Sequence, residues 1–362
     1  MPMGTGAELV RNLPEVPFDT DPKLFMQLTR GQTRPAKTLA IPGAGIAADV
    51  ELPKAGIMSK TQIIFVGTLT VATAAVTTGM GWPYCLLDPF DLSLSGATDL
   101  WHCDGEDLQA LRFVRYPAYD DDVDNYPGTI GGGDSVAVGT YDMHVTWEIP
   151  VAVDDTTLVG SLYLQSSQGN VGLKLGQALN SRLFSANPAN ATLAGNFIVM
   201  PTTWAVPRGP SGNIVVPDLS RLHGFEAHDT PFTSTGEVEA DLIRSPGQLS
   251  RLFVSARSSA TNRLSALPSA ASTKKIEALR IEYGAGERPL NFDPAAALLS
   301  RNNQHYGSLP PYDRLVFDQL RENPVRDAIL LQGVTELQAV LEVGSGVTVT
   351  AGQIRTVQET LY

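Results

Sequence analysis

Histidines and carboxylates are the residue types in this chain that could bind a metal ion. His144 and Glu148 are four residues apart in an alternating segment, so a β-strand would place both side chains on one face. One histidine and one carboxylate are too few ligands for a metal site, and a structural histidine is the favoured interpretation. His223 and His228 lie five residues apart in an irregular segment and make a weaker candidate still. We therefore predict no metal site.

Other motifs of catalysis and ligand binding are missing from the sequence. It contains no Gly-x-Ser-x-Gly nucleophile motif, phosphate-binding loop or dinucleotide-binding fingerprint. Aspartates cluster at positions 120–124 without the regular spacing of a calcium-binding loop, which favours a solvated acidic loop. Cys85 and Cys103 define neither a disulfide framework nor a thiolate metal site. We predict no catalytic residue, no cofactor-binding residue and no cofactor.

Composition and charge indicate a protein with many turns and extensive contacts. The 362 residues include 33 glycines and 25 prolines, whereas charged residues make up 18% of the chain, against an average of about 25%. Many turns between short apolar runs are typical of an all-β protein, and the shortage of charge indicates that partners cover much of the surface. The net charge of −12 argues against direct nucleic-acid binding, which needs a basic face.

Residues 61–87 form an uncharged stretch that is long enough to cross a bilayer. The stretch is rich in threonine and glycine and contains Pro83. Alternating threonine and valine followed by glycines and a proline are more typical of buried strands and a turn than of a membrane helix. The first twelve residues lack the charged and apolar regions of a signal peptide.

Two segments, half a chain apart, repeat one pattern. Residues 90–111 (FDLSLSGATDLWHCDGEDLQAL) and 279–299 (LRIEYGAGERPLNFDPAAALL) each begin as an alternating strand that ends on Gly-Ala. A few polar residues then lead to an aspartate, Asp104 or Asp293, at the position expected for a helix N-cap. Asp293 is followed by Pro294 and an alanine run, the usual order of cap, first helical position and helix body. The repeat predicts two copies of one domain fold.

The division of the chain follows from this repeat. We expect an N-terminal arm over residues 1–37, a first β domain over 38–207, a linker over 208–213 and a second β domain over 214–362. Each domain offers about eight strand candidates, among them residues 158–166 in the first and 346–352 in the second. One helical insertion follows the Gly-Ala strand in each, the second running from position 293 to about 320. The predicted fold is all-β: two tandem eight-stranded antiparallel jelly rolls with short helical insertions.

The N-terminal arm has a local excess of positive charge. Between Pro22 and Ala48 no acidic residue occurs, although the chain as a whole is acidic. Asp21 is placed to cap a short helix that begins at Pro22. A solvated face and a functional surface are equally open readings of the four basic residues, Lys23, Arg30, Arg34 and Lys37.

The order and residue pattern of the expected strands resemble those of a known family. Residues 149–177 contain a strand ending in Ile-Pro, a polar turn, a Gly-x-Leu-x-Leu-Gln strand and another amphipathic strand, and residues 195–207 form an apolar strand that closes on Val-Pro. With residues 52–71 and 352–362, this pattern resembles double jelly-roll major capsid proteins of tailless, membrane-containing icosahedral viruses, of the tectivirus and corticovirus type. The resemblance covers residues 38–362.

The resemblance implies a structural function without catalysis. In that family three chains form a pseudo-hexameric homotrimer, and trimers tile an icosahedral shell around an internal membrane. The implied partners are other copies of the chain, vertex or minor capsid proteins and the lipid membrane, and the implied location is the virion of a bacteriophage-like virus, after synthesis in the host cytoplasm. The N-terminal segment would lie at the base, with its four basic residues near lipid headgroups or a neighbouring subunit.

Two other function classes stay open at this point. A carbohydrate- or receptor-binding β-sandwich protein of a virion tail or spike would use aromatic platforms, but Trp82, Trp101, Trp147 and Trp204 all lie in strand-like sequence, which indicates core positions. A double-cupin-like enzyme would need a His-x-His pair, a glutamate and a distant third histidine. The sequence contains no His-x-His pair.

Overall fold

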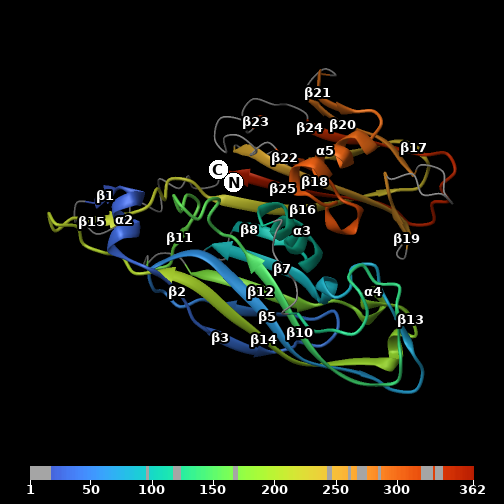
Figure 1. Ribbon diagram of the computed structural model, residues 1–362, viewed down its shortest axis with the longest axis horizontal. Coiled ribbons are helices and arrows are strands. Elements are labelled where there is room, and N and C mark those ends of the chain that lie inside the picture. The colour runs from blue at the N-terminus through green and yellow to red at the C-terminus, as the bar shows by residue number, and fades with distance from the viewer. Residues whose placement is uncertain are drawn as a thin grey trace.

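The computed structural model describes residues 18–94, 98–116, 124–165, 170–242, 247–259, 262–266, 275–283, 287–318, 329–330 and 337–362. β-strands dominate this part of the chain. Figure 1 shows the N-terminal half (blue to green) and the C-terminal half (yellow to red) as two adjacent β units. The helices are short: α2 (Pro22–Leu28), α3 (Gly105–Arg115), α4 (Asn180–Leu183) and α5 (Ala296–Tyr306).

The first unit is a jelly roll of two four-stranded antiparallel sheets. One sheet has the order β3 (Lys37–Ala40), β14 (Ala191–Trp204), β5 (Ile57–Val71) and β10 (Gly139–Ile149). The other has the order β4 (Ala47–Glu51), β12 (Val171–Gln177), β7 (Leu87–Leu94) and β8 (Thr98–Cys103). The chain crosses between the sheets from β3 to β4, from β4 to β5 and again from β5 to β7, the connectivity that defines a jelly roll.

The second unit repeats the same strand order. One sheet contains β16 (His223–Phe232), β25 (Gly352–Leu361), β18 (Gln248–Ser259) and β22 (Leu315–Asp318). The other contains β17 (Gly236–Asp241), β24 (Leu337–Val343), β20 (Ile276–Tyr283) and β21 (Glu287–Phe292). The prediction of two eight-stranded antiparallel jelly rolls is confirmed.

The remaining elements are short. Strand β2 (Gly31–Thr33) pairs with the end of β14, β11 (Leu162–Tyr163) pairs with β5, and β19 (Asn262–Leu264) and β23 (Ile329–Leu330) pair with β18. A small sheet contains β13 (Phe184–Ala186), β6 (Val76–Thr78) and β9 (Ser135–Val136). Single 3-10 turns are η1 (Tyr84–Leu86), η2 (Pro188–Asn190) and η3 (Pro311–Asp313). The domain boundaries expected at 37/38, 207/208 and 213/214 stay a prediction.

The repeated pattern corresponds to a strand hairpin followed by a helix in each jelly roll. Strands β7 and β8 lead to α3, and β20 and β21 lead to α5. Asp104 caps α3 as predicted, in a capping box with Asp107 (3.0 and 3.1 Å). The predicted cap at Asp293 is wrong, because the N-cap of α5 is Ala295 and α5 begins at Ala296.

Four other local predictions were wrong. The polar stretch before Asp104 is the strand β8. Of the strand expected over 158–166, the described residues 158–165 form turns with only β11 as strand. Residues 346–351 are not a strand. The expected helix from Asp293 to about Leu320 ends at Tyr306, because Gly307 takes a left-handed conformation (φ 77°) that terminates it, and β22 then joins the sheet.

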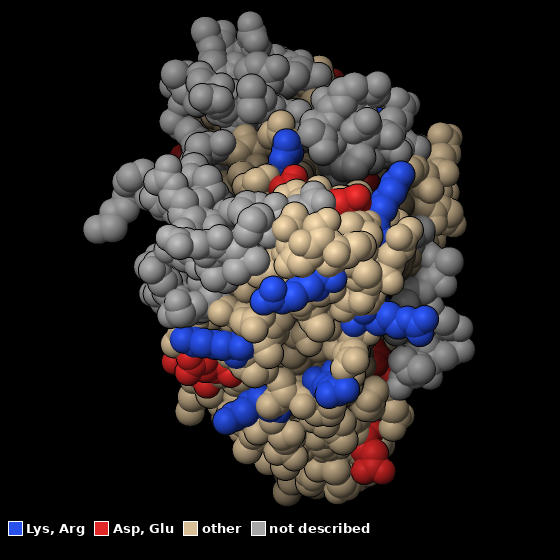
Figure 2. Space-filling view, turned by 90° about the vertical axis from the view of Figure 1, so that its left-hand side faces the viewer, with Lys and Arg blue, Asp and Glu red and all other residues tan. Residues whose placement is uncertain are grey.

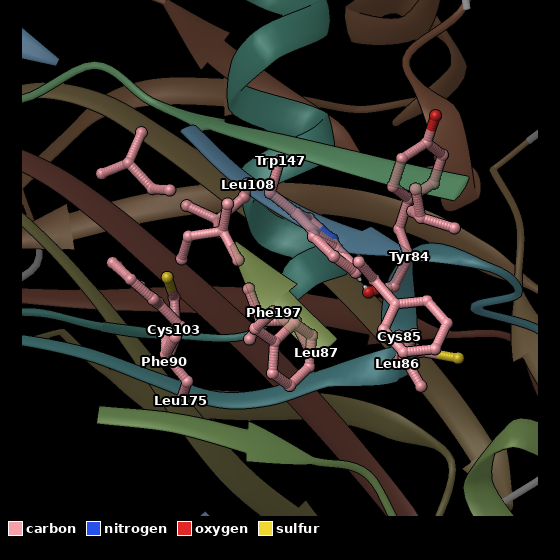
Figure 3. Close-up of a cluster of buried hydrophobic side chains, with 14 of the residues drawn as sticks. Tyr84, Cys85, Leu86, Leu87, Phe90, Cys103, Leu108, Trp147, Leu175 and Phe197 are labelled. Carbon is pink, nitrogen blue, oxygen red and sulfur yellow. Dashed lines mark hydrogen bonds between the residues drawn. The ribbon is translucent and has the colours of Figure 1, made fainter. Parts of the chain in front are cut away.

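Apolar residues fill the first jelly roll. Its strands point aromatic rings inward, where Trp147 and Phe197 lie with centroids 6.2 Å apart, and α3 contributes Leu108 to the same cluster (Figure 3). Tyr84 meets the Trp147 ring edge-on, and the Trp147 indole N–H donates to the Tyr84 carbonyl (3.1 Å). Burial on this scale is the main favourable term of folding.

The two jelly rolls share one sheet, and the core cluster of the first extends across their junction. Strand β8 pairs in parallel with β16 at Trp101–Phe225 and His102–Glu226, which joins the two units into a single ten-stranded sheet. Trp101 is fully buried there, packs on Phe225 (centroids 5.1 Å apart) and donates its indole N–H to the His223 carbonyl (3.0 Å). The core cluster of the first unit continues through Phe253 of the second.

Two buried groups of ion pairs also join the units. In the first, Asp107 of α3 contacts Arg314 (2.5 Å) and Arg355 (2.6 Å), and Asp104 contacts Arg182 (2.5 Å) and Arg355 (3.1 Å). Burial alone would raise the pKa of Asp104, but Arg355 and Arg182 outweigh it and hold that pKa well below its usual range. Asp104 is therefore charged at neutral pH, in a buried site that requires its arginine partners.

The second group centres on Glu359 of β25, whose side chain is fully buried. Glu359 accepts from Arg115 of α3 (2.7 Å) and from Arg251 of β18 (2.8 Å), and it lies 3.0 Å from His223 Nε2. Burial favours the protonated acid, but Arg251 and Arg115 hold the pKa of Glu359 well below its usual range. Arg115 thereby ties the first jelly roll to the second.

Candidate functional site at the N-terminal end

The N-terminal segment is packed against one end of the first jelly roll. Strand β1 (Phe18–Thr20) pairs in parallel with β15 (Ile214–Val216), which precedes the second jelly roll. Asp21 caps α2 as predicted and accepts from the backbone N–H groups of Lys23 (2.9 Å) and Leu24 (3.0 Å). Phe25 of α2 is fully buried against the Trp204 ring (centroids 5.9 Å apart). This end has a small core of its own.

The segment after α2 is held along the edge of the first jelly roll. Strand β2 pairs with Thr202–Trp204 of β14, and the Thr33 and Thr202 hydroxyl groups lie 2.7 Å apart. Gly31 is required at this contact, because a Cβ atom there would lie 2.9 Å from the Trp204 ring. Strand β3 continues along β14, with Lys37 opposite Val199. Residues 18–40 are therefore anchored to the first jelly roll.

The four predicted basic residues are all exposed, at successive positions along this end and edge. Lys23 is on α2, Arg30 directly precedes β2, Arg34 lies between β2 and β3, and Lys37 begins β3. Among the described residues none of the four forms an ion pair. Figure 2 shows that basic side chains are spread over this end of the molecule, with acidic ones between and beside them. The structure thus presents separate, solvated positive charges here.

A cavity of about 720 Å³ opens at this end, between the α2–β2 connection and the end of β14. Of the four predicted residues only Arg30 lines it, together with Lys54, Gln32 and Trp204. Lys54 lies in the turn between β4 and β5, and sequence reasoning missed it because nothing in a lone lysine indicates that two distant turns meet. The wall combines two cations, amides and one half-buried indole ring.

The histidines form no metal site in the described part of the chain, where no group of three histidine, cysteine or acidic residues is clustered. His144 lies 3.7 Å from Asp124, while Glu148 pairs with Lys60 (3.5 Å). His223 belongs to the buried Glu359 group, and burial lowers its pKa, whereas His228 is exposed.

The tryptophans and cysteines are core residues for the most part. Trp82, Trp101 and Trp147 are buried, as predicted, and Trp204 is half-buried beside the cavity. Both cysteines are free thiols in the core, and burial raises the pKa of each.

Of the acidic cluster only Asp124 is described, whereas the uncharged stretch is described throughout. Positions 120–122 of the aspartate cluster lie outside the described residues, and the side chain of Asp124 is buried and accepts from the Tyr84 hydroxyl (2.8 Å). Residues 61–87 form β5, β6 and η1, as the sequence indicated. Within the described residues, no helix has both the length and the apolar character needed to cross a bilayer.

Comparison with known proteins rests on structure. No protein-family model matches the chain, and no curated protein is similar to it in sequence. The crystal structure of the STIV major capsid protein matches with a TM-score of 0.68 and 17% identity, covering 92% of this chain and 96% of that one. A chain in the atomic structure of Sulfolobus turreted icosahedral virus matches with a TM-score of 0.69 and 17% identity, covering 92% of this chain and 90% of that one.

A second virus has the same architecture. The quasi-atomic model of the PBCV-1 virus capsid matches with a TM-score of 0.56 and 10% identity, covering 92% of this chain and 94% of that one. Both matches span both jelly rolls rather than one of them, because each covers nearly the whole of the two chains that are compared. The chain therefore has the fold of the double jelly-roll major capsid proteins of icosahedral viruses.

Proposed function

We propose that this chain is a major capsid protein that builds the shell of an icosahedral virion. The observation that carries the proposal is the match to the STIV major capsid protein over 92% of the chain, with both jelly rolls in the same arrangement. A fold hosts many functions, so the second support comes from the molecule itself. Its described residues contain no metal cluster, its tryptophans are mostly core, and charged residues are scarce. These features suit a protein that acts through contact surfaces rather than through catalysis.

The proposed building block is a homotrimer. One chain contributes two jelly rolls with the same strand order, joined side by side through β8 and β16. Three chains around a closed threefold axis then present six jelly rolls, a pseudo-hexamer that can tile a shell. Further partners in this proposal are neighbouring trimers and minor or vertex proteins.

The N-terminal end is proposed to face the inside of the shell. Lys23, Arg30, Arg34 and Lys37 are exposed and unpaired among the described residues, so each is available to an anionic membrane or to an acidic neighbour. A basic residue close to an anionic lipid surface contributes about 1 kcal/mol to binding. The cavity that Arg30 lines belongs to the same end.

Mass measurement of the purified protein tests the proposal. In mild buffer we expect about three times 38.7 kDa, or larger assemblies of that unit. Electron microscopy of the sample should show shell particles or fragments with pseudo-hexagonal units. A protein that is monomeric at every concentration tested would contradict the capsid function. A receptor- or carbohydrate-binding virion protein, the alternative class, would instead bind glycans in a screen and form no lattice.

A further inference from the structure

A second cavity, of about 70 Å³, lies at the junction of the two jelly rolls. Its wall takes Met80, Gly81, Glu106 and Arg182 from the first unit, and all of its remaining residues come from the second. The volume of this cavity is larger than that of one ordered water molecule and is sufficient for a small polyatomic ion. A ligand held here would contact both halves of the molecule.

The wall of this cavity is crowded with arginine side chains. Five arginines line it but only two carboxylates, Glu106 and Asp229: the arginines are Arg182, Arg257, Arg263, Arg314 and Arg355. Both carboxylates are already engaged, since Glu106 pairs with Arg182 and Arg263, and Asp229 pairs with Arg355 (2.9 Å). Three further carboxylates outside the lining, Asp88, Asp104 and Asp107, pair with Arg182, Arg314 and Arg355, so the charge is balanced in sum but unevenly distributed.

Two of the arginines are left incompletely neutralised. Arg257 forms no ion pair with any described carboxylate, and its guanidinium group donates to the neutral amide oxygen of Gln353. Arg314 is 1% exposed and reaches Asp107 through one nitrogen, while its Nε and Nη1 atoms have no hydrogen-bond partner among the described residues. Burial and the charge of Arg182 lower the pKa of Arg257, as expected where cations crowd together.

Unsatisfied buried donors and crowded cations are both unfavourable, and an anion relieves both at once. Planar guanidinium groups match the paired oxygens of tetrahedral oxyanions better than they match a halide ion. We infer that this cavity is a binding site for one small inorganic oxyanion, phosphate or sulfate, which joins the two jelly rolls. The site is independent of the proposed capsid function.

Titration calorimetry on the full chain tests this site. The protein is prepared in HEPES and sodium gluconate without phosphate, sulfate or chloride, and it is then titrated with sodium phosphate and, separately, with sodium sulfate. We expect saturable binding of one ion per chain and a rise in the melting temperature that follows the same saturation curve. Sulfate also stabilises proteins without binding to them, but that effect does not saturate.

Variants localise the site. Arg257→Gln should weaken the affinity for phosphate at least tenfold, Arg257→Lys should give an intermediate affinity because it keeps the charge and loses the planar fork, and the exposed Arg34→Gln control should bind as the wild type does. If Arg257→Gln does not fold, the comparison of Arg257→Lys with Arg34→Gln decides. Three results would each overturn the inference: no saturable binding to the wild type, equal affinity in the Arg257 variants, or equally tight binding of chloride.

Discussion

Arg355 Nη2 lies 2.6 Å from Asp107 Oδ2, which joins the last strand of the chain to the first turn of a helix 248 residues earlier. Asp107 also belongs to the capping box that starts α3 and receives Arg314 from the other side. One carboxylate therefore stabilises a helix terminus and the junction of two jelly rolls. Removing this carboxylate should destabilise both the start of α3 and the junction.

Asp107→Asn should lower the free energy of unfolding by about 3–5 kcal/mol, because it leaves Arg314 as an uncompensated buried charge and removes one of the partners of Arg355. Denaturant unfolding measures the loss. Glu237→Gln is the matched control: Glu237 also contacts an arginine, Arg280 at 2.7 Å, but its side chain is 59% exposed. Exposed pairs contribute about 1 kcal/mol or less. Equal losses in the two variants would contradict the importance of burial.

Stability should fall in acid because of Glu359. The pKa of Glu359 is depressed in the folded state, so its contribution is complete above the unfolded pKa of about 4.3. The contribution is lost as the pH falls below that value and through the folded pKa, because the unfolded chain then binds more protons. Asp104, also depressed, acts in the same direction. The melting temperature, followed from pH 7 to pH 3, should decline most steeply below about pH 4.5.

Glu359→Gln separates this residue from the other acids. The variant should be less stable at pH 7, since Arg115 and Arg251 lose their shared partner. Its stability should also decline less between pH 5 and pH 3 than that of the wild type. A pH profile parallel to that of the wild type would show that Glu359 does not cause the acid sensitivity.

Leu108→Ala should cost about 2–5 kcal/mol, because Leu108 is 1% exposed and fills the space between α3 and the rings of the first core. Leu179→Ala is the control, since Leu179 is 58% exposed and its loss should change stability by about 0.5 kcal/mol or less. Thermal unfolding of both variants, side by side, checks the prediction. A small effect at Leu108 would mean that α3 repacks easily.

Neutralising Lys23, Arg30, Arg34 and Lys37 together to glutamine should leave the trimer folded and lower its co-sedimentation with anionic lipid vesicles several-fold. Deletion of residues 1–37 is a poorer experiment, because it also removes the buried Phe25 and strand β2. The control is glutamine at Lys174, Arg221, Lys275 and Arg301, which lie outside the 18–40 segment. Unchanged vesicle binding and normal particle yield in the first variant would refute a function of these residues in assembly.

The fold could be predicted from the sequence because apolar and polar residues alternate strongly in jelly-roll strands and because the repeat marks equivalent positions in the two domains. The sequence patterns missed β8, where Thr98, Asp99 and His102 made the segment read as a polar connection although Trp101 is the buried residue that joins the two units. They also extended the second helix too far, since only pairing with β18 reveals that residues 315–318 form a strand.

The charged junction had no signal in the sequence at all. Arginine, aspartate and glutamate usually occupy solvent-exposed positions, so none of these residues taken singly indicates a buried site. The partners also lie up to 248 positions apart in the sequence. Only the folded chain shows that these residues meet in a buried site. The four basic residues of the N-terminal end are exposed and their function stays a prediction, while Lys54 joins Arg30 at the cavity through a contact that spacing does not reveal.

The parallel pairing of β8 with β16 affects how the two halves of the molecule unfold on heating. Two tandem domains with a small, wet interface usually unfold one after the other. Here the backbone hydrogen bonds, the buried Trp101 ring and the core cluster all cross from one half to the other. Neither half can open without exposing apolar surface of its neighbour, so calorimetry should record one cooperative transition in which both halves lose their structure together.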